Sequence, residues 1–480
     1  MILMRNAIVV GGGLAGITAA LALQDSGKWN VKLFEARKHL GGRVSSIRDP
    51  ETGLELDNCQ HACFRVYDHF LQLVARCNAQ KSIKFQQKTM ISFTNPASGD
   101  IGHIYDSNLK PPNHMAKSIL KFPHLRFKEK LSMRKVVKKL SKMTEEERIK
   151  LDDTSFEEWL ISNGQSKNSI DTFWGFFVLA ALNISAKKAS AAQAAFLFRR
   201  GIFGKFDAFD VGAFSHHLSH IFENDFENAL HESGVEIHKS TKINSLKWEN
   251  NTCIGASTSS NEFNADLVIM ATPHHIANKL LKSGNDSTIN ICEKLDNMEY
   301  NSLIGIHGLY SKKFIDEDFH FTALVHEPII QIVFNRNFEL NDDLDSNIHQ
   351  WLSVPVSYAD EFLKLTNEEL KEEYKKVISK IWPEHSEFLE KVVIIKSPKA
   401  TFSTQIGSTK YRPKSNENIP GLMLCGDYID NNWPSTMEGS VTSGLMAAAN
   451  ALEIKGWNND DLWTNWPNPP RRGDEAWGTF

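Results

Sequence analysis

The fold is decided near the start of the chain by the stretch AIVVGGGLAG, residues 7–16. Its four leading apolar residues predict a strand that is buried on both faces of a parallel sheet. Gly11, Gly13 and Gly16 follow at the first, third and sixth positions of a glycine-rich turn. In a dinucleotide-binding turn these glycines allow a tight bend, close approach of the backbone to a pyrophosphate, and close packing of the next helix on the strand. The stretch therefore predicts a nucleotide-binding βαβ unit.

A helix through residues 17–24 should follow, and its N-terminal end, at Leu14 and Ala15, would present unpaired N–H groups to a phosphate. A second apolar strand at residues 31–34 then leads to Glu35, nineteen residues after the last glycine of the turn. An acid at this place can accept hydrogen bonds from a ribose diol. Because strand, glycines, helix and acid all occur with this spacing, we interpret the unit as a dinucleotide site and not as a glycine turn of another α/β protein.

A second glycine turn indicates a flavin site and not a site for a nicotinamide nucleotide. Ala36 and Arg37 follow the acid, and Gly42 and Arg43 end a glycine turn that begins six residues after it. This turn would bring another backbone segment and one arginine to the same diphosphate, which a nicotinamide dehydrogenase does not need. We therefore predict FAD as the cofactor and place these four residues in its site.

Length, charge and cysteine content limit the classes of protein to which the chain can belong. A chain of 480 residues is long enough for two intertwined domains with a large core. The net charge of −4 gives no general attraction to nucleic acid, and we expect no such partner. Six cysteines without a CxxC spacing indicate a reducing compartment and no metal site, so we expect a cytoplasmic protein. No apolar run approaches the length of a bilayer span.

Residues 54–61 predict a strand that runs into a polar turn. In glutathione-reductase-like flavoproteins, which share the opening described above, the corresponding segment passes beside the isoalloxazine ring. Asn58, Cys59 and Gln60 are therefore candidate cofactor contacts. His61 is the candidate for proton transfer, because a histidine titrates close to neutral pH. The alternative is that His61 hydrogen-bonds the backbone and only shapes the turn.

Later segments complete the predicted nucleotide site. Residues 234–246 alternate like strands, and the backbone near Ile243 would lie against the adenine. Another apolar strand ends in Gly426 and Asp427, and this acid can hold the ribityl chain. A helix that begins near Met437 would point its N-terminus at the flavin edge where negative charge collects on reduction.

A basic and apolar segment, residues 110–142, differs from the rest of the chain. It contains eleven Lys or Arg residues against one acid, Glu129, with apolar residues interleaved. Such a segment suits the surface of an anionic membrane, which would place the protein peripherally on the inner face of the plasma membrane. The alternative is an ordinary solvated helical face, and the sequence does not decide between the two.

Residues 173–206 are rich in phenylalanine, alanine and leucine. A stretch of this composition forms core or lines a pocket for a large apolar ligand, and we expect part of each. The tail at residues 456–480 carries four of the eleven tryptophans and is either a poorly ordered extension or a docking strap.

We predict an α/β fold class in which a glutathione-reductase-like (Rossmann-type) FAD-binding domain is intertwined with a mixed α+β substrate domain. The FAD-binding domain would comprise residues 1–80, 201–290 and 401–455. The substrate domain would comprise residues 81–200 and 291–400 and include the basic and apolar segment. Residues 456–480 would form the separate tryptophan-rich tail.

The chain resembles the flavin amine oxidase and phytoene desaturase superfamily in its opening fingerprint, its second glycine turn, Asp427 and the helix at Met437. Its internal motifs are similar to those of one branch, the hydroxysqualene dehydroxylases. These motifs lie at residues 57–61, 181–183, 189–191, 328–336, 399–402 and 425–440. The resemblance extends over roughly residues 5–450.

This resemblance implies an FAD-dependent enzyme that removes an allylic hydroxyl from a C30 isoprenoid, converting hydroxysqualene to squalene with hydride from flavin N5. Such a reaction needs an apolar tunnel for the isoprenoid and a proton donor near the leaving oxygen, for which His61 is the candidate. It also needs an electron donor, and a single dinucleotide fingerprint does not identify that partner.

Three alternatives remain open. A carotenoid or phytoene desaturase would use the same fold and a similar lipid, but oxidatively. A flavin amine oxidase would favour an aromatic cage and often a lysine beside the flavin, whereas Thr436 precedes Met437 and residues 302–307 contain no lysine. A flavin-binding membrane scaffold without turnover belongs to a different class altogether.

Overall fold

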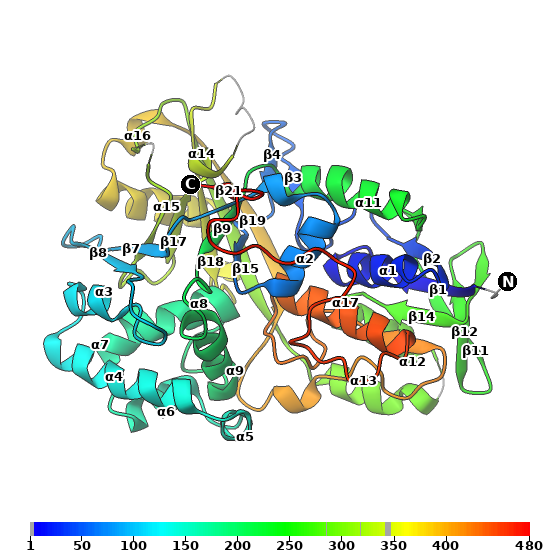
Figure 1. Ribbon diagram of the computed structural model, residues 1–480. Helices are drawn as coiled ribbons and strands as arrows, with labels where there is room; N and C mark the ends of the chain where they lie inside the picture. Colours follow the sequence, from blue (N-terminus) through cyan, green and yellow to red (C-terminus); the bar gives the residue numbers. More distant parts are fainter. Residues whose placement is uncertain (1–3, 285, 317, 341–346) are drawn as a thin grey trace.

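A computed structural model describes residues 4–284, 286–316, 318–340 and 347–480 (Figure 1). The opening motif lies in a parallel sheet of five strands, and residues Ala7 to Val10 are buried as predicted. The strand order is β10-β2-β1-β14-β20, with every neighbouring pair parallel. The strands are β1 (Arg5–Val10), β2 (Trp29–Phe34), β10 (Glu236–His238), β14 (Leu267–Met270) and β20 (Leu422–Leu424).

Two helices at opposite ends of the sequence pack on this sheet. α1 (Leu14–Asp25) follows the glycine turn, and α17 (Met437–Ala451) begins where the sequence predicts it. Figure 1 shows α1 above α17, with α2 (Asp68–Arg76) at their left end. A methyl group on Gly444 would lie 2.5 Å from the carbonyl oxygen of Ala15, so this glycine allows the two helices to approach closely. Both helices are buried over most of their length, since their residues are small or apolar on every face.

A small antiparallel sheet and two helices cover the other face of the parallel sheet. Their apolar side chains share a core with Ile8, Val10 and Phe34. The elements are β11 (Ser245–Glu249), β12 (Thr252–Ser257), β13 (Glu262–Asn264), α12 (His274–Lys282) and α13 (Ile289–Asp296).

A second, seven-stranded sheet has the order β19-β15-β18-β17-β16-β7-β8. It is antiparallel apart from the parallel pairing of β16 with β7. The charged helix α15 (Asn367–Ile381) packs against this sheet. The strands are β7 (Met90–Thr94), β8 (Ile101–Tyr105), β15 (Tyr300–Tyr310), β16 (Phe321–Leu324), β17 (Ile332–Asn335), β18 (Gln350–Ser357) and β19 (Leu389–Phe402).

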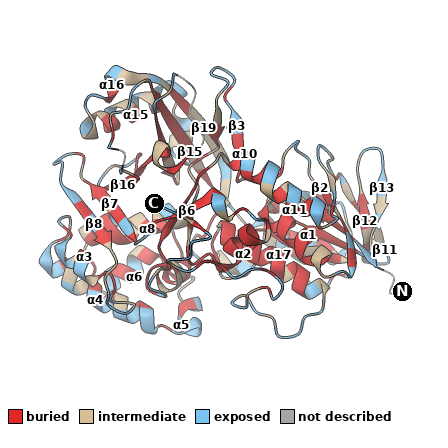
Figure 2. Cartoon of the chain, turned by 45° about the horizontal axis from the view of Figure 1, so that its top comes forward, coloured by how far each residue is buried: buried red, intermediate tan, exposed pale blue. Residues whose placement is uncertain are grey.

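A layer of helices from residues 116–196 packs beside the seven-stranded sheet, and Figure 2 shows its buried interior and exposed outer side. Ser155 caps α6, because its hydroxyl accepts a hydrogen bond from the backbone N–H of Glu158 at 3.1 Å. The helices are α3 (Ala116–Lys121), α4 (Phe127–Lys142), α5 (Glu145–Ile149), α6 (Phe156–Ser162), α7 (Lys167–Ser169), α8 (Gly175–Leu182) and α9 (Ala191–Phe196).

The tryptophan-rich tail is a strap. Trp463, Trp466 and Trp477 are buried, and β21 (Gly478–Thr479) adds a strand to a small sheet with β6 (Ile83–Phe85), β9 (Val211–Phe214) and β5 (Ala62–Phe64). Of the two alternatives for the tail, the structure therefore supports the strap. The domain boundaries proposed above stay a prediction.

Candidate cofactor and substrate site

A cavity of 630 Å³ lies at the carboxyl ends of the parallel strands. Residues that follow β1, β2, β14 and β20 line it. The cavity therefore lies beside β1, from which the sheet continues to β2 on one side and to β14 on the other. Open α/β sheets bind nucleotides at this point. The cavity extends from this nucleotide end to an apolar end at the seven-stranded sheet, where Leu303, Ile332, Phe334 and Pro355 line it.

The three glycines of the opening turn differ in why a side chain would not fit at their positions. A methyl group on Gly11 would lie 2.6 Å from the carbonyl oxygen of Ala271, and one on Gly16 would lie 1.9 Å from that of Gly11. These two positions therefore need glycine for the protein's own packing. A methyl group on Gly13 would meet only the Cα atom of Gly42, at 3.9 Å, and would otherwise project into the cavity. The space beside Gly13 fits the diphosphate that the motif predicts.

The N-terminus of α1 is open to a ligand at this place. Gly13 is its N-cap and provides no side-chain hydrogen bond, and the first turn contains no acid. Leu14 and Ala15 line the cavity directly after it. The first N–H groups of a helix have no partner within the helix, so they and the positive end of the helix dipole are available to a phosphate.

Glu35 ties the second strand to the glycine turn. Its carboxylate accepts hydrogen bonds from the backbone N–H of Gly12 and of Arg37, both at 2.8 Å. Ala36, Thr241, Lys242 and Ile243 also line the cavity. The carboxylate thus has a fixed position at the edge of the cavity, with lone pairs left for a ribose diol.

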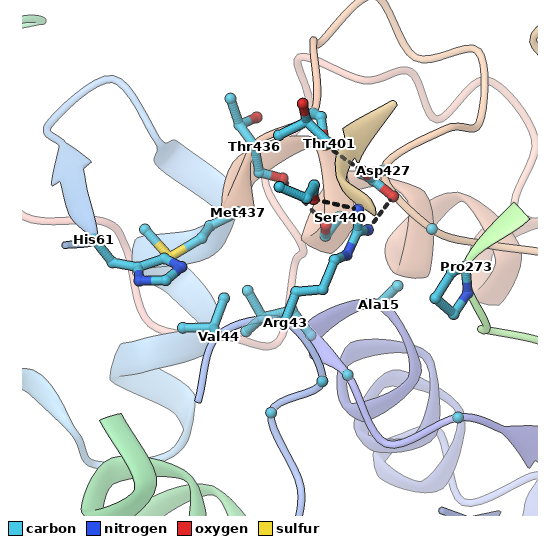
Figure 3. Close-up of a pocket in the computed structure, with 18 of the residues that line it drawn as sticks. Ala15, Arg43, Val44, His61, Pro273, Thr401, Asp427, Thr436, Met437 and Ser440 are labelled. Atoms are coloured by element: carbon cyan, nitrogen blue, oxygen red, sulfur yellow. Dashed lines mark hydrogen bonds and ion pairs between the residues drawn. The ribbon is translucent and has the colours of Figure 1, made fainter. Parts of the chain in front are cut away.

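Arg43 and Asp427 form an ion pair inside the cavity (Figure 3). Arg43 Nη2 lies 2.5 Å from Asp427 Oδ1, and Arg43 Nη1 donates to the carbonyl oxygen of Ala400 at 3.0 Å. Burial disfavours the charge on Asp427, but the charge and hydrogen bond of Arg43 outweigh this effect, so the pKa of Asp427 lies below its usual 3.8. Ser435 also donates a hydrogen bond to this carboxylate. Asp427 is therefore an ionised acceptor, and Gly426 precedes it in the cavity wall.

Side-chain hydrogen bonds to other segments hold the polar turn at residues 58–60 in place. Asn58 Nδ2 donates to the carbonyl oxygen of Arg43 at 2.7 Å, and Gln60 Nε2 donates to both carboxylate oxygens of the buried Glu339, at 3.0 and 2.9 Å. Cys59 and Gln60 line the cavity, whereas Asn58 does not. The amide of Asn58 supports the arginine turn, and its direct contact with the cofactor stays a prediction.

His61 lies in the cavity wall close to its apolar end (Figure 3). Its Nδ1 is 2.9 Å from the carbonyl oxygen of Cys59, so Nδ1 carries the proton of that hydrogen bond. Burial lowers the pKa of His61 below its ordinary 6.5, against the opposing effects of the Cys59 carbonyl and Asp57. The backbone hydrogen bond that we expect if His61 only shapes the turn is therefore present. It leaves Nε2 available for a second proton.

The N-terminus of α17 faces the same cavity. Thr436 Oγ1 accepts a hydrogen bond from the backbone N–H of Gly439 at 3.0 Å, and Met437 and Ser440 line the cavity. Glu438 points elsewhere, since its carboxylate accepts hydrogen bonds from the N–H groups of His69 and Phe70 at the start of α2, at 3.1 and 2.8 Å. The positive end of the α17 dipole is therefore available to negative charge in the cavity.

The apolar end also contains a phenol, Tyr67, that belongs to no sequence motif. Tyr67 lines the cavity, and within the described residues its hydroxyl makes no hydrogen bond. Burial raises its pKa, so the hydroxyl stays protonated. An adjoining cavity of 30 Å³ shares Tyr67, Phe64, Ala181 and Thr436 with the larger one.

The aromatic stretch at residues 173–206 contributes mainly to the core. Phe173, Trp174, Phe177 and Phe198 are buried in one cluster with the inner face of α4. Only small residues of this stretch, Ala180, Ala181 and Asn183, line the main cavity, and Phe196 and Leu197 line the adjoining one. The large side chains therefore support the wall, and the small ones leave the space.

Most of the predicted site residues surround one cavity. Gly16 and Asn58 are the two that do not line it. Those that line it are Gly11, Gly13, Leu14, Ala15, Glu35, Ala36, Arg37, Gly42, Arg43, Cys59, Gln60, His61, Ile243, Gly426, Asp427 and Met437. Thr401, Ser435, Thr436 and Ser440 also line it. They lie within the sequence motifs at residues 399–402 and 425–440, but a motif does not show which of its side chains face a cavity.

The parallel sheet, the two glycine turns and the dinucleotide-sized cavity define a flavoprotein of the Rossmann type. The family model for flavin containing amine oxidoreductases matches residues 14–452, and the chain belongs to this family. It is an FAD-dependent oxidoreductase, which confirms the predicted cofactor and enzyme class.

Named relatives and solved structures agree with this assignment. The chain is 24% identical to hydroxysqualene dehydroxylase of Zymomonas mobilis over 92% of its own length and 98% of that protein. It is also 24% identical to 15-cis-phytoene desaturase of Synechococcus elongatus, over 93% and 95% of the two chains. Among solved structures, putrescine oxidase is similar with a TM-score of 0.74 at 19% identity, covering 94% and 99% of the two chains. An oxidoreductase from Methanosarcina mazei has a TM-score of 0.72 at 16% identity, covering 93% and 100%. The structural likeness confirms the predicted fold class.

The described ranges contain no helix that is both long enough and apolar enough to cross a bilayer.

Proposed function

We propose that this oxidoreductase acts on a C30 isoprenoid and removes its allylic hydroxyl by reduction, converting hydroxysqualene to squalene. The observation that carries the proposal is one cavity with two unlike ends, a nucleotide end at the glycine turns and an apolar end at the second sheet. His61 and Tyr67 lie in the wall of the apolar part. The similarity to hydroxysqualene dehydroxylase over nearly the whole of both chains supports this substrate class.

The reaction consumes two electrons and two protons. The C–O bond of the alcohol breaks, the oxygen leaves as water, and the same carbon gains a C–H bond. The flavin, when bound in its reduced form, supplies the hydride and with it the electron pair. The remaining proton must reach the leaving hydroxyl from the protein or from solvent. The source of electrons that reduces the flavin is a partner of unknown identity.

The residues of the nucleotide end would hold the cofactor. We assign the diphosphate to the N–H groups that follow Gly13 and to Arg43, the ribose of the adenosine to Glu35, and the ribityl chain to Asp427. The backbone near Ile243 would lie against the adenine. The N-terminus of α17 at Met437 would stabilise negative charge on the flavin ring.

His61 is our candidate for the proton donor. Because Nδ1 is committed to the Cys59 carbonyl, a second proton would sit on Nε2, and its lowered pKa would make the protonated ring a stronger acid than free imidazole. Tyr67 would offer a protonated hydroxyl to the same oxygen. The apolar walls would keep water from a cation formed when the hydroxyl leaves.

A product assay tests the proposal against its rivals. The purified holoenzyme is incubated with hydroxysqualene and dithionite, and separately with phytoene and an oxidising quinone, and the lipids are analysed by mass spectrometry. We expect squalene in the first reaction and no desaturated product in the second. The opposite pattern would support the second candidate, a phytoene-type desaturase, which the similarity to 15-cis-phytoene desaturase favours. A flavoprotein that converts neither lipid would contradict both.

A lipid substrate leads to the further proposal that the enzyme works at a membrane surface. The support for this proposal is the excess of basic residues in the segment 110–142.

A further inference from the structure

The segment 110–142 forms α3 and α4, and its only acid is turned away from solvent. Glu129 is 8% exposed, and its carboxylate accepts hydrogen bonds from the backbone N–H of Arg126 at 2.7 Å, from Asn168 Nδ2 at 3.0 Å and from Ser166 Oγ at 2.5 Å. Met133, Val136 and Leu140 lie on the same buried side of α4 and pack into the core. The opposite side of the helix therefore has no negative charge of its own.

The exposed side of α4 carries basic residues in successive turns. Lys128, Arg134, Lys135, Lys138 and Lys142 are all exposed. Within the described parts of the chain, none of these five forms an ion pair with a carboxylate. Cations that lack internal partners produce a positive potential outside the molecule.

Large apolar side chains lie among these cations. Phe127 is 68% exposed and Leu131 is 50% exposed, one helical turn apart on α4. Leu120 of α3 is 56% exposed, and Lys130 Nζ donates to its carbonyl oxygen at 2.9 Å, which brings the end of α3 beside α4. Figure 2 shows exposed residues along both helices at the edge of the molecule. Exposed apolar side chains grouped inside a basic face are typical of a surface that contacts a membrane or another protein.

We propose that this face, which we call the α3–α4 surface (Leu120, Phe127 and Leu131 with the five cations of α4), docks on a bilayer that contains anionic phospholipids. Charge complementarity selects an anionic surface, and the three apolar side chains would reach into the region between headgroups and acyl chains. The proposal rests on the proposed function for the choice of a bilayer over an acidic protein, because the substrate would be dissolved in lipid.

The position of the surface in the fold agrees with this role. The inner face of α4 shares its core cluster with Phe177 and with Phe334 of β17. Phe334 and Ala180, which lies on α8 with Phe177, also line the apolar end of the cavity. The same helical layer thus carries the docking surface on its outside and supports the substrate wall on its inside.

Vesicle binding tests the proposal without any turnover. The FAD-loaded full-length protein is mixed with vesicles of phosphatidylcholine alone or with one-third phosphatidylglycerol, and flotation measures the bound fraction at 0.05 and 0.5 M salt. We expect binding to the anionic vesicles at low salt, at least about 10-fold weaker binding at high salt, and little binding to neutral vesicles. Equal binding to both vesicle types, or none, would overturn the proposal.

Two sets of variants separate the surface from general charge. K128E/K135E/K138E reverses three cations of α4, and K28E/K279E/K455E reverses three exposed lysines elsewhere, so that the net charge changes equally. At about five-fold per cation, the first should weaken binding by roughly 100-fold or more, and the second by less than about 10-fold. L131S should weaken binding, unlike I289S, which changes an isoleucine that is also 50% exposed but lies on α13. Equal losses within either pair would contradict the assignment to α3 and α4.

The vesicle-binding result tests the α3–α4 surface separately from the proposed reaction. Squalene formation is measured in detergent with the same variants, where docking is not needed, and we expect unchanged turnover and flavin content. Loss of vesicle binding with retained turnover supports the surface. Vesicle binding by a protein that converts neither lipid would overturn the proposed function and leave the surface in place.

Discussion

Gly13 and Gly16 lie three residues apart but differ in what a side chain would meet. A methyl group on Gly16 would collide with the Gly11 carbonyl oxygen at 1.9 Å, whereas one on Gly13 would enter the cavity. We expect G13V to leave the apoprotein within about 0.5 kcal/mol of the wild type but to abolish the yellow colour of the purified protein. G16A should instead cost about 3 kcal/mol or more of folding free energy. Absorbance at 450 nm and urea unfolding of the apoproteins measure the two effects.

The control for this pair is Gly27, where a methyl group would meet no atom within 4 Å, although its positive φ makes alanine mildly strained. G27A should keep its flavin. If G13V also kept its flavin, the assignment of the diphosphate to this turn would be wrong.

His61 should act through a protonated ring. Its pKa lies below 6.5 in the folded protein, so the protonated fraction grows as the pH falls from 7.5 towards 5.5, and turnover should rise over the same range. We expect H61Q to bind flavin normally and to lose about 10²- to 10⁴-fold in turnover, with a flat pH profile. Steady-state rates between pH 5.5 and 8 give the measurement. An H61Q enzyme that keeps the wild-type pH dependence would assign the proton to another group, with Tyr67 the first to test by Y67F.

At the level of single residues, the sequence predicts groups that belong to a spacing motif and misses those that do not. Gly13, Glu35 and Asp427 all follow apolar strands at fixed intervals, and all line the cavity. The side-chain direction of Asn58 and the contribution of Tyr67 depend on packing against segments that are distant in the chain. No local pattern encodes such contacts.

Among the elements, the tryptophan-rich tail contributes to the stability of the fold. Its composition alone did not show whether it is ordered. Trp466 is 5% exposed, and its Nε1 donates to Asp25 Oδ2 at 2.9 Å at the end of α1. We expect W466A to lower the free energy of unfolding by about 3–5 kcal/mol, because a buried indole is removed. Urea unfolding of the FAD-free protein measures this loss.

Trp457 provides the matched control, since it only packs against the edge of the same core while partly buried. W457A should cost clearly less than W466A. Equal and small losses for both variants would mean that the tail does not contribute to stability as a strap.

The predicted elements with a strong local signal agree with the structure. β1 and α17 have the expected positions, because the apolar run defines the strand and the Gly426-Asp427 strand end places the helix that follows it. The pairing of β7 with β16 could not be predicted, because it joins strands more than 200 residues apart and depends on the whole sheet. The tail strand β21 is likewise too short to carry a pattern.

At the scale of the whole molecule, buried neutral histidines make stability depend on pH. Burial lowers the pKa of His307 to about 4, and Trp351 Nε1 donates to its Nδ1 at 3.1 Å. The unfolded chain takes up this proton below pH 6.5, while the folded protein does so only near pH 4. Stability is therefore present above pH 6.5 and should fall by about 3 kcal/mol for this group as the pH drops to 4.

The variant H307Q isolates this contribution, since glutamine can still accept the Trp351 hydrogen bond but does not titrate. Its unfolding free energy should depend less steeply on pH between 6.5 and 4 than that of the wild type. H103Q, at an exposed histidine, is the control and should keep the wild-type slope. A slope for H307Q equal to that of the wild type would show that His307 is not the neutral buried group.

The central claim for the whole molecule is that a flavin at the nucleotide end reduces a lipid alcohol at the apolar end of one cavity. An anaerobic single turnover tests it most directly: holoenzyme reduced with one equivalent of dithionite is mixed with hydroxysqualene, and the flavin absorbance at 450 nm and the lipid products are followed together. We predict that the oxidised flavin spectrum returns and that one squalene forms per flavin. A flavin that stays reduced in the presence of hydroxysqualene, with no squalene formed, would contradict the account.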